Sequence, residues 1–431
     1  MFRKVVLDNF ESFSHVEMDL TDPHGKPLDH AFVLGPNGCG KTCLMRSFRF
    51  LVDSTLTPNG ARSISELASG HRMADSDDII RLEFSFVARA DATYVMGIGP
   101  DGMAFESLDY RVDGMERNLF MVSRSDDGIS TMFHEAFPDK EETEDAIAGH
   151  WGDRTALSVL RERIADGRAV YEGIRNVLRF IDGIRVCVYG APSPYIDPEC
   201  GTIPSCDRKL LEAREDSVSE FFSRAFPDFF GAHYDIKEDG GVIRYRLMFE
   251  RRIGGSRRNI PATEESSGIR SLLRVLPYLL DSANGKTVLI DELDTEIHTN
   301  VIQDIMGELL NTSAGQLIAT THNTAILQDI DPRNAFVIRR VGYKGKEILP
   351  FSSLDDTRKG DDNEERYRNG AFGGAPVVSF VDLKEIAEAS RRIAGRPRPP
   401  RPAHTDLPSS SASASCSGLS LTAPGSMFPP A

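Results

Sequence analysis

The stretch AFVLGPNGCGKTCLMRSFRFLV, residues 31–52, joins an apolar run, a glycine-rich turn and a second apolar run. Within it, GPNGCGKT (35–42) matches the pattern G-x-x-x-x-G-K-[ST], which lies between a strand and a helix. Glycines let backbone N–H groups turn inward around phosphates, and the helix N-terminus adds the positive end of its dipole. A glycine turn without a ligand is the alternative, and the flanking strand and helix patterns argue against it.

The motif gives expected roles to the residues of this loop. Lys41 is expected to reach the β- and γ-phosphates of a nucleotide, and the Thr42 hydroxyl is expected to bind Mg²⁺. The predicted nucleotide-binding residues are Gly35, Pro36, Asn37, Gly38, Cys39, Gly40, Lys41 and Thr42.

Two further apolar runs end in residues with catalytic chemistry. TVLIDE (287–292) ends in Asp291, a candidate Mg²⁺ ligand, and Glu292, a candidate for orienting or deprotonating the attacking water. GQLIATTH (315–322) ends in His322, which we expect to contact the γ-phosphate. One βαβ unit separates the runs, so both strand ends are predicted at the same sheet edge. The alternatives are a solvated acidic loop and a structural histidine.

The stretch ATEESSGIR (262–270) precedes the apolar run SLLRVLPYLL, and it lies between the glycine loop and TVLIDE. A simple interpretation is that its serines cap the following helix. The order of the motifs along the chain suggests a further role for Ser266, Ser267 and Gly268 as nucleotide-binding residues.

The remaining patterns predict a mixed α/β protein. Residues 2–34 and 78–125 alternate apolar and polar positions, which predicts two or three strands and then an antiparallel meander. Residues 137–225 have mainly helical spacing, and 232–260 predict a hairpin with Asp-Gly-Gly at its turn. From 263 to 340, helices and buried strands alternate, which indicates a parallel sheet with crossover helices.

These patterns divide the chain into four parts. We expect the first part of an ATPase head at 1–136, a helical insert at 137–230, the second part of the head at 231–393, and a disordered Pro/Ser-rich tail at 394–431.

Composition narrows the class of protein. The 431 residues are 40% hydrophobic and 27% charged, and no apolar run reaches the roughly 20 residues that span a bilayer. We therefore expect a cytoplasmic globular protein. The net charge of −15 argues against a generally basic nucleic-acid surface, although RRIGGSRR (251–258) is locally basic. The six cysteines form no CxxC pair, so reduced thiols rather than a zinc site are expected.

The motif order resembles that of ABC-type ATPases of the structural-maintenance-of-chromosomes and DNA-repair lineage. It is more similar to short bacterial AAA-family ATP-binding proteins allied to the overcoming-lysogenization-defect ATPases. The similar segments, which span most of residues 2–380, are LDNFESF, the glycine loop, FESLDY, the Ser-x-Gly signature, DELDTEIH, TTHNTAIL and RYRNGAFGGAP. The fold implied is a P-loop ATPase head of the ABC type, with an antiparallel β lobe and a helical insert.

The sequence departs from the usual ABC pattern in two places. The signature reads Glu265-Ser266-Ser267-Gly268 instead of a Leu-Ser-Gly-Gly-like stretch, and no glutamine is assigned to the Q-loop. The resemblance also makes Asp294 a candidate D-loop residue and matches His298 to a recurring histidine of the group.

The resemblance implies ATP and Mg²⁺ as ligands and a head-to-tail homodimer or higher homo-oligomer. Each ATP would lie between one glycine loop and the partner's signature, where Ser267 and Gly268 offer donors to the γ-phosphate. Hydrolysis would reopen the dimer.

The resemblance leaves several outputs for ATP turnover. The first is a sensor or regulator of a separate effector, a nuclease or toxin, in phage defence or a toxin–antitoxin-like pair. An intrinsic nuclease is not expected, because the acidic residues Asp355, Asp356, Asp361 and Asp362 lie in a polar, loop-like run. The alternative is a DNA-binding repair or chromosome-maintenance ATPase that clamps duplex. An ATPase that serves a transporter fits poorly.

Overall fold

The computed structural model describes residues 1–56, 63–73, 78–112, 114–125, 128–312, 314–342, 345–354, 362–374 and 383–394. Met1–Pro376 form one compact unit, and a second unit begins at Val377. The described part of the second unit is a helix, α10 (Leu383–Ala394). The predicted disordered tail lies, after Ala394, outside the described residues, as do Asp355, Asp356 and Asp361.

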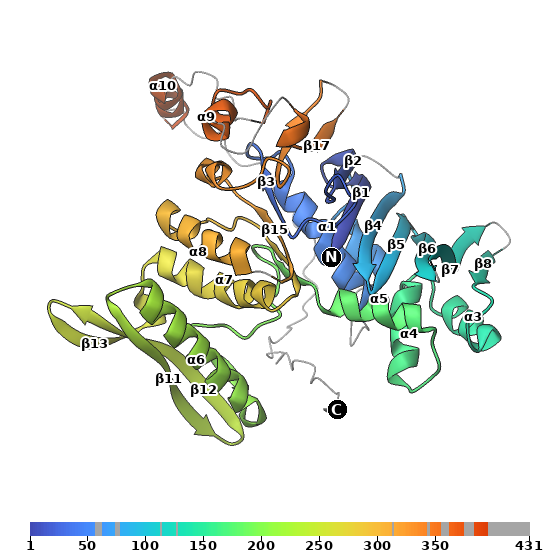
Figure 1. Cartoon of the computed structure of the whole chain (residues 1–431), viewed down its shortest axis with the longest axis horizontal. Helices are drawn as coiled ribbons and strands as arrows, with labels where there is room; N and C mark the ends of the chain where they lie inside the picture. Colours follow the sequence, from blue (N-terminus) through green and yellow to red (C-terminus); the bar gives the residue numbers. More distant parts are fainter. Residues whose placement is uncertain are drawn as a thin grey trace, which may run out of the picture. The chain divides into compact units, whose positions relative to one another are not determined.

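Six strands form the sheet that carries the glycine loop, in the order β17-β16-β3-β15-β14-β9. Five of them run parallel, and β17 joins one edge antiparallel. Their bounds are β3 (His30–Leu34), β9 (Arg185–Cys187), β14 (Thr287–Ile290), β15 (Gln316–Thr320), β16 (Ala335–Arg340) and β17 (Lys346–Pro350). This sheet and its connections confirm the predicted P-loop α/β fold (Figure 1).

Three helices position the ends of these strands. α1 (Lys41–Thr55) starts directly after the glycine loop, α7 (Ser267–Ala283) packs against β14 and β9, and α8 (Thr299–Thr312) connects β14 to β15. α7 forms because buried leucines recur at helical spacing, at Leu272, Leu276 and Leu279. β14 and β15 are buried along their whole length, which explains their continuous apolar sequence.

The N-terminal antiparallel lobe is a sheet of seven strands in the order β2-β1-β4-β5-β6-β7-β8. Its strands are β1 (Phe2–Phe10), β2 (Phe13–Asp19), β4 (Ile80–Ala88), β5 (Ala90–Gly99), β6 (Gly102–Val112), β7 (Met115–Ser125) and β8 (Gly128–Phe133). The predicted meander is confirmed, and the first two strands extend it at one edge. In β4, buried and half-buried residues alternate at every position, so one face of the strand is in the core.

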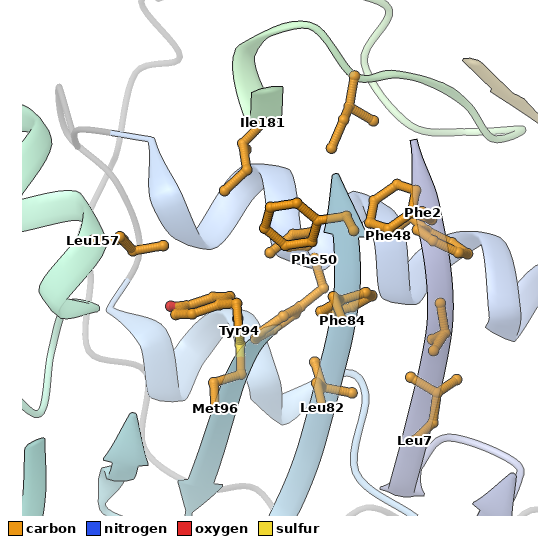
Figure 2. Close-up of a cluster of buried hydrophobic side chains, with 14 of the residues drawn as sticks. Phe2, Leu7, Phe48, Phe50, Leu82, Phe84, Tyr94, Met96, Leu157 and Ile181 are labelled. Atoms are coloured by element: carbon orange, nitrogen blue, oxygen red, sulfur yellow. The ribbon is translucent and has the colours of Figure 1, made fainter. Parts of the chain in front are cut away.

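Large apolar side chains fill the space between this lobe and the helices that cover it. Figure 2 shows Phe48 of α1 beside Phe2 and Phe84. The rings of Phe2 and Phe48 lie 4.8 Å apart at their centroids, and all these side chains are fully buried. Because α1 also contacts β9 of the parallel sheet, this core fixes the helix that follows the glycine loop.

Helices dominate residues 137–225, as predicted. They are α3 (Lys140–Ala148), α4 (Ala156–Ala165), α5 (Glu172–Asp182) and α6 (Arg208–Ala225). The helical pattern did not predict β9 or β10 (Cys200–Pro204), because strands of three and five residues give too short a periodic signal. Two more short helices are α2 (Ile64–Ser69) and α9 (Asn363–Arg368), and the Asp362 side chain caps α9.

A third sheet consists of β10, β11 (Phe229–Asp239), β12 (Val242–Ile253) and β13 (Ser256–Pro261). We call this sheet and α6 the arm (Figure 1). Asp239 pairs with Val242 across Gly240 and Gly241, both of which have positive φ, so the predicted two-residue hairpin turn is confirmed. The buried residues of β12 alternate with exposed ones, and α6 packs against β11.

A buried glutamine joins the N-terminal lobe to the parallel sheet. The Gln316 side chain accepts a hydrogen bond from the Phe2 N–H at 2.6 Å, and it donates to the carbonyls of Phe2 and Leu28 at 2.9 and 2.8 Å. Gln316 is the first residue of β15, so these bonds fix the start of the strand that leads to His322. No helix among the described residues is long and apolar enough to cross a membrane.

Candidate nucleotide-binding site

The glycine loop has the backbone geometry that its sequence predicts. Gly38 has a φ of 74°, and a Cβ built there would meet nothing within 4 Å, so the tip of the loop is open. Gly35 and Gly40 are packed tightly instead. A Cβ on Gly35 would lie 2.7 Å from the Cys39 sulfur, and one on Gly40 would lie 2.6 Å from the Phe13 ring. Gly35 and Gly40 also have positive φ values, of 154° and 120°, so conformation favours glycine at all three positions and close packing adds to it at Gly35 and Gly40.

Lys41 is the first residue of α1, and its ammonium group is folded into the loop. Its Nζ donates to the carbonyl of Gly35 at 2.7 Å and lies 3.4 Å from that of Pro36. The residue is only 6% exposed, and burial lowers the pKa of its ammonium group. No carboxylate in the described part of the chain forms an ion pair with it. A buried cation that makes no direct ion pair fits an anionic ligand such as a phosphate.

The acidic end of β14 is bound to the neighbouring strand through one hydroxyl group. The Thr320 Oγ1 donates to the Asp291 Oδ1 at 2.6 Å and accepts from the Glu292 N–H at 2.7 Å. Glu292 adopts a left-handed backbone with a φ of 52°, which turns the chain immediately after β14. The Thr295 hydroxyl donates to the Glu292 Oε2 at 3.1 Å, so the side chain of this glutamate is also oriented.

His322 lies beside these groups at the end of β15. Its backbone N–H donates to the Asp294 Oδ1 at 3.3 Å. Burial and the nearby charge of Lys41 lower the pKa of its imidazole, which is therefore neutral at pH 7. Asp291, Glu292 and Asp294 act on both Lys41 and His322 electrostatically, so the structure brings the predicted lysine, acids and histidine together.

The predicted signature begins α7, and its residues have different partners. Ser266 occupies the N-cap position, yet its side chain makes no capping hydrogen bond. Glu265 is buried, and its carboxylate pairs with the Arg251 guanidinium of the arm at 2.5 Å. A Cβ on Gly268 would lie 2.7 Å from the carbonyl oxygen of Glu296, so this glycine permits close packing within its own chain.

The signature does not join the glycine loop within one chain. Among the described residues, no hydrogen bond or ion pair connects Ser266, Ser267 or Gly268 to residues 35–42. Both serines are exposed. His298, the other histidine of this region, lies before α8, where its ring Nδ1 accepts from the Asn300 N–H at 3.3 Å.

The sequence did not identify one element at the same sheet edge. β9 is parallel to β14, so its C-terminal end lies beside Asp291, and the Asp291 N–H donates to the Cys187 carbonyl at 2.8 Å. The loop 186–193, Arg274, Tyr278 and the two acids line a cavity of about 250 Å³. Tyr189 in this loop is 83% exposed, and no glutamine is present there. The run RVCVYG followed by Pro192 is the signal that could have revealed this strand end.

Comparisons with known proteins give one family match and several similar solved structures. A family model described as "AAA domain, putative AbiEii toxin, Type IV TA system" matches residues 210–328, less than a third of the chain. This range includes the signature, the acidic strand end and His322, but not the glycine loop. No curated protein sequence matches the chain.

Solved structures of SMC head domains are similar at low sequence identity. One is an Smc head bound to the C-winged helix domain of ScpA (14% identity, TM-score 0.45), which covers 81% of this chain and 97% of the other. A second is the SMC head domain from Thermotoga maritima, with 15% sequence identity and a TM-score of 0.38. The similarity covers 81% of this chain and 98% of that domain. A third is an Smc head with an extended coiled coil, bound to the C-terminal domain of ScpA derived from Pyrococcus furiosus, with 13% sequence identity and a TM-score of 0.41. The similarity covers 81% of this chain and 95% of that head. Similarity at this level does not extend to function.

The electrostatic coupling between Lys41 and His322 gives a test of this site. In Lys41→Met the pKa of His322 should rise toward its ordinary value of 6.5, because the cation that lowers it is removed and the three acids remain. The imidazole resonances, followed by NMR during a pH titration, report this pKa directly. Lys237→Met removes a charge from the exposed part of β11 and should leave the pKa of His322 unchanged. An unchanged value in Lys41→Met would contradict the arrangement described above.

Proposed function

We propose that this chain binds ATP with Mg²⁺ and hydrolyses ATP to ADP and phosphate. The observation that supports this proposal most directly is the buried ammonium group of Lys41, which hydrogen-bonds to the carbonyl of Gly35 inside a glycine loop. The acids at the end of β14 lie close enough to act on that ammonium electrostatically. A phosphate-binding lysine and a residue that orients or deprotonates the attacking water are recurring parts of nucleotide-hydrolysing sites.

Thr42 and Asp291 are the proposed Mg²⁺ ligands. The Thr320 hydroxyl binds the Oδ1 of Asp291, and within the described part of the chain no hydrogen bond reaches its Oδ2. That oxygen is suited to a hard cation. Mg²⁺ would neutralise charge on the β- and γ-phosphates.

Glu292 is the proposed general base, and His322 is the proposed sensor of the γ-phosphate. Thr295 binds one carboxylate oxygen of Glu292, which leaves the other to accept a hydrogen bond from the attacking water. A neutral His322 ring can donate one hydrogen bond to a phosphate oxygen.

We assign the second half of the ATP site to another copy of the chain. The hydroxyls of Ser266 and Ser267 are exposed, and the first turn of α7 has no side-chain cap. Uncapped N–H groups at a helix N-terminus favour an anion, and the γ-phosphate held by a partner's loop would supply one. Closure of the dimer would therefore require ATP, and hydrolysis would remove the group that bridges the two chains.

The proposed output is regulation of a separate effector, a nuclease or toxin, in phage defence or a toxin–antitoxin-like pair in the cytoplasm. One observation supports it. The family model that matches residues 210–328 is described as "AAA domain, putative AbiEii toxin, Type IV TA system".

Glu292→Gln provides the main test of the catalytic assignment. The variant should bind ATP like the wild type and lose at least about 100-fold in hydrolysis rate, because the amide cannot accept the water's proton. It should also accumulate as a dimer in ATP. Calorimetry, phosphate release and light scattering measure these three properties. Glu308→Gln, an exposed change on α8, should behave like the wild type. A normal hydrolysis rate in Glu292→Gln would show that another group is the base.

Mixing two inactive variants tests whether the signature acts in trans. Lys41→Ala removes the phosphate-binding cation, and Ser267→Arg blocks the signature with an exposed substitution. Each alone should hydrolyse no ATP. An equal mixture should recover roughly a quarter of the wild-type rate, because half of randomly formed dimers are mixed and each has one intact site. No recovery, with light scattering confirming that mixed dimers form, would contradict the trans model.

The alternative output is the clamping of duplex DNA. The observation that favours it is the hairpin 251–258, where the guanidinium groups of Arg252 and Arg257 lie 5.3 and 4.0 Å from the Phe230 ring centroid. If the alternative holds, fluorescence anisotropy should show duplex binding that weakens steeply with salt and tightens with ATP. Binding that ATP does not change would leave the effector model preferred.

A further inference from the structure

A second lysine lies at the glycine loop, on a strand far from it in sequence. Lys346 is the first residue of β17, and it pairs with Arg340 at the C-terminal end of β16. β16 is the parallel neighbour of β3, the strand that leads into the glycine loop. The end of β16 and the start of β17 therefore lie at the same sheet edge as the loop. β17 also contacts β2 (Figure 1).

The contacts of Lys346 place its ammonium group against the loop itself. Its Nζ lies 3.5 Å from the Gly38 carbonyl oxygen and 5.3 Å from the centre of the Phe13 ring. Phe13 is the residue that packs under Gly40. The backbone before the lysine is also fixed, because Gly345 has a φ of 114° and a Cβ there would lie 2.8 Å from the Ser14 hydroxyl.

The charge of this lysine is not compensated by the described residues around it. No carboxylate among them forms an ion pair with Lys346. The residue is half-buried, burial lowers the pKa of its ammonium group, and the charge of Arg340 lowers it further. The titratable groups on the loop side are the thiols of Cys39 and Cys43, whose pKa values burial raises, so they are neutral at pH 7. A half-buried cation beside another cation favours the binding of an anion.

We propose that Lys346 is a second phosphate-binding cation for the nucleotide held by the glycine loop. This inference rests on the proposed binding of ATP. Lys41 and Lys346 reach the loop from different places, since Lys41 binds the carbonyls of Gly35 and Pro36 and Lys346 approaches that of Gly38. The tip of the loop at Gly38 is open, so a phosphate bound there would lie close to the ammonium group of Lys346.

A competing explanation is that Lys346 only holds the loop in shape through its contact with Gly38. Three substitutions separate charge from shape. Lys346→Arg keeps the charge, Lys346→Gln keeps a hydrogen-bond donor without the charge, and Lys346→Met keeps the alkyl chain over Phe13. Lys237→Gln, on the exposed part of β11, controls for the loss of one positive charge from the protein.

The experiment measures the Kd of Mg²⁺–ATP for the full chain by calorimetry at two salt concentrations. Thermal unfolding without nucleotide shows that each variant folds. Loss of a charge-assisted hydrogen bond should raise the Kd about tenfold in Lys346→Gln and Lys346→Met. Lys346→Arg and Lys237→Gln should stay close to the wild type, and high salt should narrow the difference.

Three kinds of result would overturn the inference. Wild-type affinity in folded Lys346→Gln or Lys346→Met would show that the charge does not contact the phosphates. An equal loss in Lys346→Arg, or a difference that high salt leaves unchanged, would assign Lys346 to loop structure alone. Failure of the wild-type chain to bind Mg²⁺–ATP would overturn the proposed function and this inference together.

Discussion

The hydroxyl group of Thr320 holds the candidate site together, because it bonds to both residues at the acidic end of β14. It donates to the Asp291 carboxylate and accepts from the Glu292 N–H, so one side chain sets the position of the proposed metal ligand and the proposed base. The bond to Asp291, which is 9% exposed, is buried, and the bond from the Glu292 N–H is partly buried. Breaking such a bond would leave a buried polar group unsatisfied at about 1–3 kcal/mol. The strand ends are therefore fixed before any ligand binds, as electrostatic catalysis requires.

The order of the strands explains why this hydroxyl is available. β15 lies between β3, which leads into the glycine loop, and β14, which leads to the acids. His322 at the end of β15 consequently stands between the lysine and the carboxylates, and it is influenced by both. The lowered pKa of its imidazole follows from that position, since burial and Lys41 outweigh the acids. Gln316 fixes the other end of the same strand to the N-terminal lobe. β15 therefore links the lobe that packs α1 to the edge where the chemistry would occur.

Much of this arrangement could be predicted because it is encoded locally. The glycine loop, the buried runs that end in Asp291 and His322, and the hairpin at Gly240 each depend on residues close together in sequence. The missing parts depend on contacts between distant segments. Thr320 was visible as a strand residue, but its role requires β14 beside it. β9 was too short to give a periodic signal, and Lys346 comes near Gly38 only through the pairing of β16 with β3. Register and strand order decide these roles, and a single sequence does not specify either.

The signature shows how the structure changes an argument made from residue type. A glycine at the start of a helix is easily attributed to ligand binding. At Gly268, however, the close approach of the Glu296 carbonyl within the same chain already explains why the residue is glycine. Glu265 likewise serves the chain by pairing with Arg251 of the arm. No contact of this kind explains the two serines, because the Ser266 side chain does not cap the helix and Ser267 beside it is exposed. The case for a second copy of the chain thus rests on the two serines and the uncapped N–H groups of α7. The Glu265–Arg251 pair also connects the segment that carries these serines to the arm, because Glu265 directly precedes Ser266 and Arg251 belongs to β12.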